Sequence, residues 1–340
     1  MVPSPDAGAK VVVGVGAPLV SPRPRRLALV ALSAALGACR HHPARRDHAP
    51  PDCPAPAVTG AAWRHTGSRV AAALGDPRHR AADVVAAAGA PVTLTGKFAY
   101  GKVDKDLEGE PIQVFVTDAG GCTARRLPDA VTDDDGRVAV AAALAPGVHR
   151  YWLAAPGDGT VATGAAWVLD RPTPAVVFDV DGTLTTDDGE LLEDLLGGAA
   201  DIRPGAAEVA ARWAARGYLV VYLTGRPDLL RERTRAWLDA HHLPRGPLLT
   251  PARIADGLPT RASVGAYKRE ALRALIAAGV VVERAYGNAA TDVCAYAEAG
   301  IAPARTYILG TPTPCDGHPL PNALATYVGH VADVDRQPAR

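Results

Sequence analysis

Two aspartates near the middle of the chain follow a short apolar run. The run is Ala175-Val-Val-Phe178, and Asp179 and Asp181 stand at its end. An apolar run without alternation is typical of a strand buried on both faces of a parallel sheet. Side chains alternate along a strand, so the two carboxylates share one side, at the end where open α/β sheets bind ligands. Buried charges there need a cation or a hydrogen-bond network to receive them.

Hydrolysis of a phosphate ester needs a nucleophile, a proton shuttle, a cation and donors to the phosphoryl oxygens. Asp179 is the predicted nucleophile, because a carboxylate can form an aspartyl-phosphate. Asp181 is the predicted acid/base, which would protonate the leaving alkoxide and later deprotonate water. Thr224 follows a second apolar run and offers a hydroxyl to a phosphate oxygen, and Gly225 would let the backbone approach that phosphate.

Residues further along the chain supply the positive charge and a second acid. Lys268 is expected to begin a helix and to neutralise the phosphate or the nucleophile. Asp292 follows Gly287-Asn288 and is expected at the start of another helix. Magnesium takes hard oxygen ligands and usually keeps several waters, so Asp179 and Asp292 are predicted magnesium ligands.

The order of these residues resembles the motifs of the haloacid dehalogenase superfamily of phosphotransferases. Asp-x-Asp-Gly-Thr at 179–183 resembles its first motif, Thr224 its second and Asp292 its fourth, with Lys268 between them. The resemblance implies a Rossmann-like α/β domain with a parallel sheet, phosphate contacts from Gly182 and Thr183, and a magnesium contact from the backbone carbonyl of Asp181. For the aspartate motif alone, the alternatives are a calcium-type acidic loop or a plain strand end.

A narrower resemblance covers residues 171–310. It rests on Asp-x-Asp-Gly-Thr-x-Thr at 179–185, Arg203-Pro-Gly205, Gly217-Tyr218, Leu243-Pro-x-Gly-Pro-Leu-Leu249, Tyr267-Lys268 and Gly-Asn-x-x-x-Asp-Val-x-Ala-Tyr at 287–296. These segments look like the catalytic domain shared by lipins and the C-terminal part of some phosphatidylinositol-transfer proteins. In that family lipins are magnesium-dependent phosphatidate phosphatases, whereas the transfer-protein relatives have lost the nucleophile and bind phosphatidic acid. Acids at both 179 and 181 favour a catalyst, although lipins carry Ser-Ala where this chain has Thr224-Gly225.

Arg226, Asn288 and the identity of the substrate each have alternative interpretations. Arg226 is either a surface guanidinium or a substrate contact, and Asn288 either orients Asp292 or ligates through water. The gaps between the motifs are too short for a separate lid with its own core, so we expect a minimal cap and an open site. An open site suits a lipid phosphate, with phosphatidate first. The rivals are a sensor that binds phosphatidate without turnover and a phosphatase of soluble phosphomonoesters.

Secondary-structure patterns indicate an α/β domain at 171–340 behind an all-β domain. In the α/β part, strands are expected at 175–179, 218–223, 246–250, 285–287 and 306–309, and helices at 190–196, 204–216, 228–241 and 268–278. Short alternating strands at 91–170 predict a small antiparallel, immunoglobulin-like sandwich, either a scaffold or a lipid- or partner-binding module. Its lead-in, 67–88, has a helical pattern with Asp76 as N-cap before Pro77. Asp133 to Asp135 suggest an acidic hairpin tip or a cation loop.

The first residues are expected to be a signal, not part of the fold. Within residues 1–38, arginines precede the apolar stretch 27–36 and then small residues, which is typical of a secretory signal. Leu36-Gly-Ala-Cys39 also resembles the lipobox of bacterial lipoproteins, which implies a lipidated Cys39; the alternative is an ordinary signal peptide with an incidental cysteine. Residues 39–62 are expected to be a solvated tether before the β-rich domain, 63–170.

Export implies an oxidising compartment in the cell envelope and membrane attachment through the lipid. The remaining cysteines, Cys53, Cys122, Cys294 and Cys315, could therefore pair, with connectivity open. The 36 basic and 36 acidic residues balance, which gives no nucleic-acid footprint. No apolar run after the signal is long enough to span a bilayer, and nothing indicates the oligomeric state.

Overall fold

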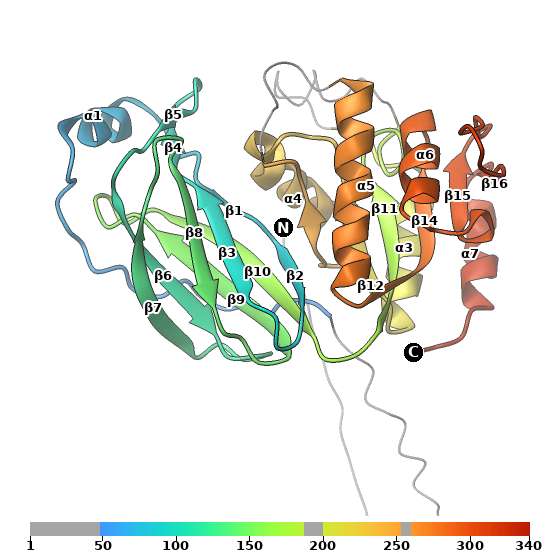
Figure 1. Ribbon diagram of the computed structural model, residues 1–340, viewed down its shortest axis with the longest axis horizontal. Coiled ribbons are helices and arrows are strands. Elements are labelled where there is room, and N and C mark those ends of the chain that lie inside the picture. Colours follow the sequence, from blue (N-terminus) through green and yellow to red (C-terminus); the bar gives the residue numbers. More distant parts are fainter. Residues whose placement is uncertain (1–47, 187–199, 253–259) are drawn as a thin grey trace, which may run out of the picture. The chain divides into compact units, whose positions relative to one another are not determined.

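The computed structural model describes residues 48–186, 200–252 and 260–340, which belong to one compact unit (Figure 1). The expected signal with Cys39 and the expected helix at 190–196 lie outside the described residues. None of the helices within the described ranges is long and apolar enough to cross a membrane.

The first part of the described chain is a β-sandwich (Figure 1). One sheet has the order β1 (Arg80–Ala81), β3 (Val92–Lys97), β8 (Arg137–Ala142). The other has the order β2 (Val84–Ala87), β10 (Val161–Leu169), β9 (Gly147–Ala154), β6 (Pro111–Thr117), β7 (Ala124–Val131). A short ladder joins β4 (Ala99–Tyr100) to β5 (Lys105–Asp106). Apolar side chains such as Leu94, Val114 and Leu153 fill the core between the sheets. The predicted sandwich is confirmed, with one parallel pair, β2 and β10, among antiparallel neighbours.

The lead-in to the sandwich is only partly helical. Helix α1 (Thr66–Leu74) lies where the Ala-rich pattern begins. The second predicted helix, with Asp76 as its cap, is wrong, because this stretch forms β1 and β2 instead. Val84 to Ala87 pair with Ala166 to Leu169 of β10, and this ladder outweighs the helix propensity of the alanines.

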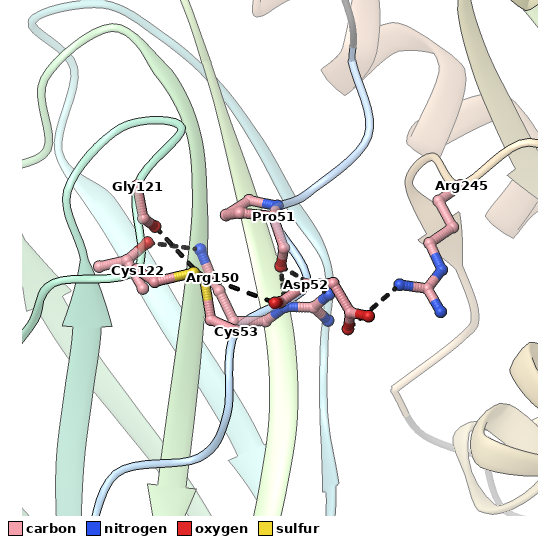
Figure 2. Close-up of a disulfide and its surroundings, with 8 residues drawn as sticks. Pro51, Asp52, Cys53, Gly121, Cys122, Arg150 and Arg245 are labelled. Atoms are coloured by element: carbon pink, nitrogen blue, oxygen red, sulfur yellow. Dashed lines mark hydrogen bonds and ion pairs between the residues drawn. A yellow bond between two sulfur atoms is a disulfide. The ribbon is translucent and has the colours of Figure 1, made fainter.

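The segment before the sandwich is attached to it at several points. Residues 48–62 contain no helix or strand. A disulfide joins Cys53 to Cys122, and the Arg150 guanidinium donates to the Pro51 carbonyl at 3.1 and 3.2 Å (Figure 2). Residues 59–62 are exposed, as the tether prediction expects, but the attachment at Pro51 and Cys53 was not predicted. The other described disulfide joins Cys294 to Cys315.

The second part of the chain is a six-stranded parallel sheet with helices on both faces (Figure 1). The strand order is β13 (Leu248–Leu249), β12 (Leu219–Leu223), β11 (Thr173–Asp179), β14 (Val280–Gly287), β15 (Thr306–Leu309), β16 (Asn322–Leu324). The helices are α3 (Ala206–Ala215), α4 (Arg231–Ala240), α5 (Arg261–Ala277), α6 (Ala290–Glu298) and α7 (Tyr327–Asp335), with 3-10 turns η1 (Asp228–Leu230) and η2 (Pro303–Arg305). This confirms the predicted mixed α/β architecture with a parallel sheet.

Strand β11 occupies the centre of this sheet, between β12 and β14. Its Val176 and Phe178 belong to one core cluster with residues of α3, α4 and α7. Its Ala175 and Val177 belong to another cluster with residues of α5 and α6. Both faces of the strand are thus covered, which explains why its apolar run does not alternate.

The helix boundaries and the C-terminal elements differ from expectation. Helix α5 begins seven residues before Lys268, because Thr260 and Ser263 form a capping box at its start. Lys268 therefore lies inside the helix instead of opening it. No element was predicted beyond residue 310, and the structure adds β16 and α7 there.

Candidate functional site

Three charged side chains from distant parts of the chain meet at the carboxyl end of β11. Lys268 Nζ on α5 donates to Asp179 Oδ1 at 2.6 Å and to Asp292 Oδ1, also at 2.6 Å. All three residues are buried, with exposed fractions of 2% for Asp179, 4% for Lys268 and 0% for Asp292. Because β11 and β14 are parallel neighbours, their carboxyl ends bring the two acids to the same edge of the sheet.

Asp292 is held by the turn that precedes α6. The backbone N–H groups of Asn288 and Ala289 both donate to Asp292 Oδ2 at 3.0 Å. Gly287 ends β14, and a Cβ added there would lie 2.6 Å from Asp292 Cβ. The missing side chain at position 287 therefore lets the first turn of α6 approach the strand closely enough to aim this carboxylate at Lys268.

Thr183 and Gly182 belong to the turn after β11. Thr183 Oγ1 lies 3.0 Å from Asp179 Oδ2 and 3.0 Å from Asn288 Oδ1. Both neighbours are acceptors and the hydroxyl has one hydrogen, so Thr183 donates to Asp179 or to Asn288 at any one time, and it lies between the nucleophile candidate and the β14–α6 turn. Gly182 has a φ of 67°, which favours glycine, and its carbonyl accepts from Arg203 Nε at 2.8 Å.

A second group of polar residues surrounds Asp181. Thr224 Oγ1 donates to Asp181 Oδ2 at 2.9 Å, and Arg226 Nε donates to Asp181 Oδ1 at 2.7 Å. The Asp181 side chain is 24% exposed, in contrast to the enclosed Asp179. Both Asp181 oxygens thus receive a hydrogen bond from the loop that follows β12.

Arg226 is the site residue whose environment the sequence does not reveal. It is 1% exposed, and its Nη1 also donates to Thr234 Oγ1 on α4 at 3.3 Å. The surface interpretation of Arg226 is therefore wrong. An arginine after a glycine in a turn looks solvated in a sequence, and only the positions of Asp181 and α4 reveal its burial.

Gly225 has a packing role in the structure. A Cβ there would lie 2.7 Å from Val264 Cγ1 in the first turns of α5. The glycine thus allows α5, which carries Lys268, to lie against the loop after β12.

Burial and neighbouring charges shift the protonation of the central residues. Burial, followed by the charge of Asp292, raises the pKa of Asp179 to about 8, against the opposing effect of Lys268. Burial alone would lower the pKa of Lys268, but Asp179 and Asp292 together raise it above its usual value. Two carboxylates facing one ammonium leave a deficit of positive charge when both are ionised.

The donor set around Asp179 fits a hard divalent cation such as magnesium. The carboxylates of Asp179 and Asp292 both contact Lys268 Nζ, and Thr183, which contacts Asp179, also contacts the side-chain oxygen of Asn288. Such oxygens are the ligands that magnesium prefers. Another group of possible ligands, Cys294, Glu298 and Cys315, differs in kind, because its two sulfurs are joined in a disulfide.

Two protein families match this chain. The family described as "PITM 1-3, LNS2 domain" matches residues 176–310, and "PITM 1-3, beta-sandwich domain" matches residues 77–168. The resemblance to the domain found in phosphatidylinositol-transfer proteins is thus confirmed for the α/β part. It extends to the sandwich, which the sequence alone did not relate to any family.

Curated relatives agree with these matches. Membrane-associated phosphatidylinositol transfer protein 1 of Rattus norvegicus is 33% identical over 270 residues, 76% of this chain and 20% of its own length. Membrane-associated phosphatidylinositol transfer protein 3 of Homo sapiens is 32% identical over 246 residues, 69% of this chain and 24% of its own. Protein retinal degeneration B of Drosophila melanogaster is 32% identical over 241 residues, 68% of this chain and 18% of its own. The chain thus spans about a fifth of the length of the curated relatives it matches.

Among solved structures, a protein described as a HAD-like phosphatase from Mesorhizobium loti is similar to part of this chain. It is 17% identical, with a TM-score of 0.39, and the match covers 50% of this chain and 89% of the other. A likeness this distant carries no argument about activity.

Proposed function

We propose that the residues around Asp179 form the active centre of a magnesium-dependent phosphomonoesterase, with phosphatidate or a related lipid phosphate as substrate. The observation that carries this proposal is the convergence of Asp179, Lys268 and Asp292 at one edge of the parallel sheet. The match to a domain of phosphatidylinositol-transfer proteins supports a lipid as the substrate class.

In the proposed reaction, an oxygen of Asp179 attacks phosphorus while the bond to the leaving alkoxide breaks and Asp181 gives that alkoxide a proton. Water then attacks phosphorus, its proton passes to Asp181, and the bond to Asp179 breaks to release phosphate. Lys268 counters the phosphoryl charge, and Thr224 with the turn at Gly182 and Thr183 orients the phosphoryl oxygens. Magnesium, held by Asp179, Asp292 and the Asp181 carbonyl, would supply charge stabilisation and in-line alignment.

A specific observation favours a second candidate, a domain that binds phosphatidate without turnover. Both oxygens of Asp181 already accept a hydrogen bond, one from Arg226 and one from Thr224, so this carboxylate is engaged by the loop after β12. The first step of hydrolysis, however, needs the same carboxyl to reach the leaving alkoxide. Relatives named as transfer proteins are also consistent with binding.

Phosphate release from phosphatidate in detergent micelles, with magnesium present, tests the proposal. We expect the Asp179→Asn variant to lose release by at least about 10³-fold, because the nucleophile is gone, and EDTA to abolish release in the native protein. Asp201→Asn, at an exposed aspartate, is the matched control and should keep the native rate.

Each other outcome selects another function. Release that is unchanged in Asp179→Asn would refute the mechanism. Binding to phosphatidate vesicles without any release would support the second candidate. Faster release from small soluble phosphomonoesters than from phosphatidate would replace the lipid with a soluble substrate.

We also propose that the protein is exported to the cell envelope and held at a membrane by a lipid on Cys39. The names of its relatives support membrane association, and the signal-like composition of residues 1–38 supports export. Fractionation of a Cys39→Ala variant tests this, since the variant should leave the membrane fraction.

A further inference from the structure

A buried carboxylate of the sandwich, Asp83, binds the α/β part at α4 and β13. Asp83 stands in the short connection from β1 to β2, and its side chain is 4% exposed. Asp83 Oδ1 accepts from Arg231 Nη2 at 2.8 Å, and Asp83 Oδ2 accepts from Arg235 Nη2 at 2.6 Å. The backbone N–H of Leu248 in β13 donates to Oδ2 at 2.8 Å. One acid thus fixes the start of a helix and an edge strand.

Two further ion pairs lie a few residues before Arg231 in the chain. In these the acid belongs to the α/β part and the arginines belong to the sandwich. Asp228 begins η1, two residues after Arg226. Its carboxylate is bound by Arg80 of β1 at 3.1 Å and by Arg137 of β8 at 3.3 Å. Asp83 and Asp228 therefore fasten both ends of the segment 228–235 to the sandwich. We call these two groups of ion pairs the Asp83 clamp and the Asp228 clamp.

The fastened segment contacts the proposed site directly. Thr234 lies on α4 between the arginines that Asp83 binds, and its Oγ1 accepts from Arg226 Nη1 at 3.3 Å. Arg226 Nε in turn donates to Asp181 Oδ1 at 2.7 Å. A continuous series of contacts therefore runs from Asp83 through α4 and Arg226 to the proposed acid/base.

We propose that the β-sandwich is a positioning element of the site, and that Asp83 is a positioning residue that acts on Asp181 through α4 and Arg226. This inference rests on the proposed function, because it assigns the sandwich a part in the same reaction. It makes the sandwich more than a spacer: without the clamps, α4 and the loop after β12 would no longer hold Arg226 against Asp181.

The test uses the full chain with Asp83→Asn, which keeps the shape but removes the charge that binds both arginines. We expect kcat for phosphatidate to fall about 10- to 100-fold, with a smaller change in KM, because Arg226 and Asp181 are misplaced while the nucleophile is not. Hydrogen exchange should increase in residues 224–240 and stay unchanged in 173–179. Asp129→Asn, which breaks an exposed ion pair with Arg126 on the same sandwich, is the matched control.

A second variant covers the case in which Asp83→Asn does not fold. Arg137→Gln removes one ion pair of the Asp228 clamp at a partly exposed position. It should lower kcat and increase hydrogen exchange in residues 224–240 as Asp83→Asn does, but by a smaller amount. In the Asp83→Asn background, Arg226→Lys should add less to the loss in kcat than it does alone, since both act on Asp181. Additive effects, or native kcat and exchange at 224–240 despite a lower Tm, would overturn the inference. If the native protein releases no phosphate at all, the proposed function fails, and the exchange measurement alone decides whether the sandwich holds this segment.

Discussion

Asp179 combines a reactive role with an environment that disfavours its charge. Its side chain is nearly enclosed, and a second acid, Asp292, binds the same ammonium. Burial, followed by repulsion from Asp292, raises the pKa of Asp179 to about 8. The residue that would attack phosphorus thus lies in surroundings that disfavour its ionised form, and a bound cation would oppose that effect.

This imbalance predicts a stability gain when the charge is removed. Because the pKa of Asp179 is higher in the folded than in the unfolded chain, its ionisation destabilises the fold progressively as pH rises from about 4 to about 8. Asp179→Asn should therefore raise the Tm of the EDTA-treated protein, most strongly near pH 8 and hardly at all near pH 4. Melting curves across this range check it, with Asp201→Asn as control. A gain that is independent of pH would contradict the assignment.

The sequence could predict the central acids but not the residue beside them. The meeting of Asp179, Lys268 and Asp292 was predictable from the order of the motifs. The two acids follow parallel neighbouring strands, whose carboxyl ends share one edge of the sheet whatever the conformation of the loops. Arg226 could not be placed, since its burial depends on Thr234 of α4 and on Asp181. Long-range contacts of this kind leave no local pattern.

At the scale of elements, the first turns of helix α6 are held at two positions. Its start carries Asp292, and Cys294 in the next residues forms a disulfide with Cys315, 21 positions later. Cys315 belongs to the segment that follows β15. The disulfide therefore connects the helix of the proposed metal ligand to the segment between β15 and β16.

We expect the paired variant Cys294→Ser/Cys315→Ser to lose about 3 kcal/mol of unfolding free energy, the usual effect of opening a loop of this size. Magnesium affinity should fall as well, because the start of α6 is less constrained. The matched control is Cys53→Ser/Cys122→Ser, which opens the sandwich disulfide and should lower stability without changing magnesium affinity. Denaturant titration and calorimetry measure the two quantities. Equal magnesium affinity in both variants would show that the Cys294–Cys315 disulfide does not position Asp292.

Local sequence patterns predicted most helices and strands. They failed where pairing with a strand distant in the sequence determines the secondary structure. Residues 80–87 look helical because alanines dominate, yet they form strands because β3 and β10 offer them partners. The region beyond residue 310 gave no periodic signal, since β16 has only three residues, Asn322–Leu324. By contrast, the apolar runs of β11 and β12 are buried on both faces and were recognisable from composition alone.

For the whole molecule, charge pairs connect two parts that each have their own core. The sandwich core and one face of the α/β sheet bury separate apolar clusters, and a third cluster joins Ala165 and Trp167 of β10 to the other face of that sheet. Between them Asp83 meets Arg231 and Arg235, and burial is outweighed by these two charges, which lower the pKa of Asp83. A carboxyl with a lowered folded-state pKa stabilises the fold at every pH above its unfolded value and stops doing so as pH falls below about 4.

Acid should therefore weaken the connection through Asp83, and removal of its charge should abolish that sensitivity. At pH 7, Asp83→Asn should lower the unfolding free energy by about 3 to 5 kcal/mol, because it leaves buried guanidinium groups without their acid. Below about pH 4 the unfolded chain takes up a proton at this carboxyl more readily than the folded protein does, so the difference between native and variant should shrink toward pH 3. Urea unfolding followed by tryptophan fluorescence at both pH values measures it, with Asp129→Asn as the exposed counterpart. A difference that is as large at pH 3 as at pH 7 would mean that packing around position 83, and not its charge, holds the two parts together.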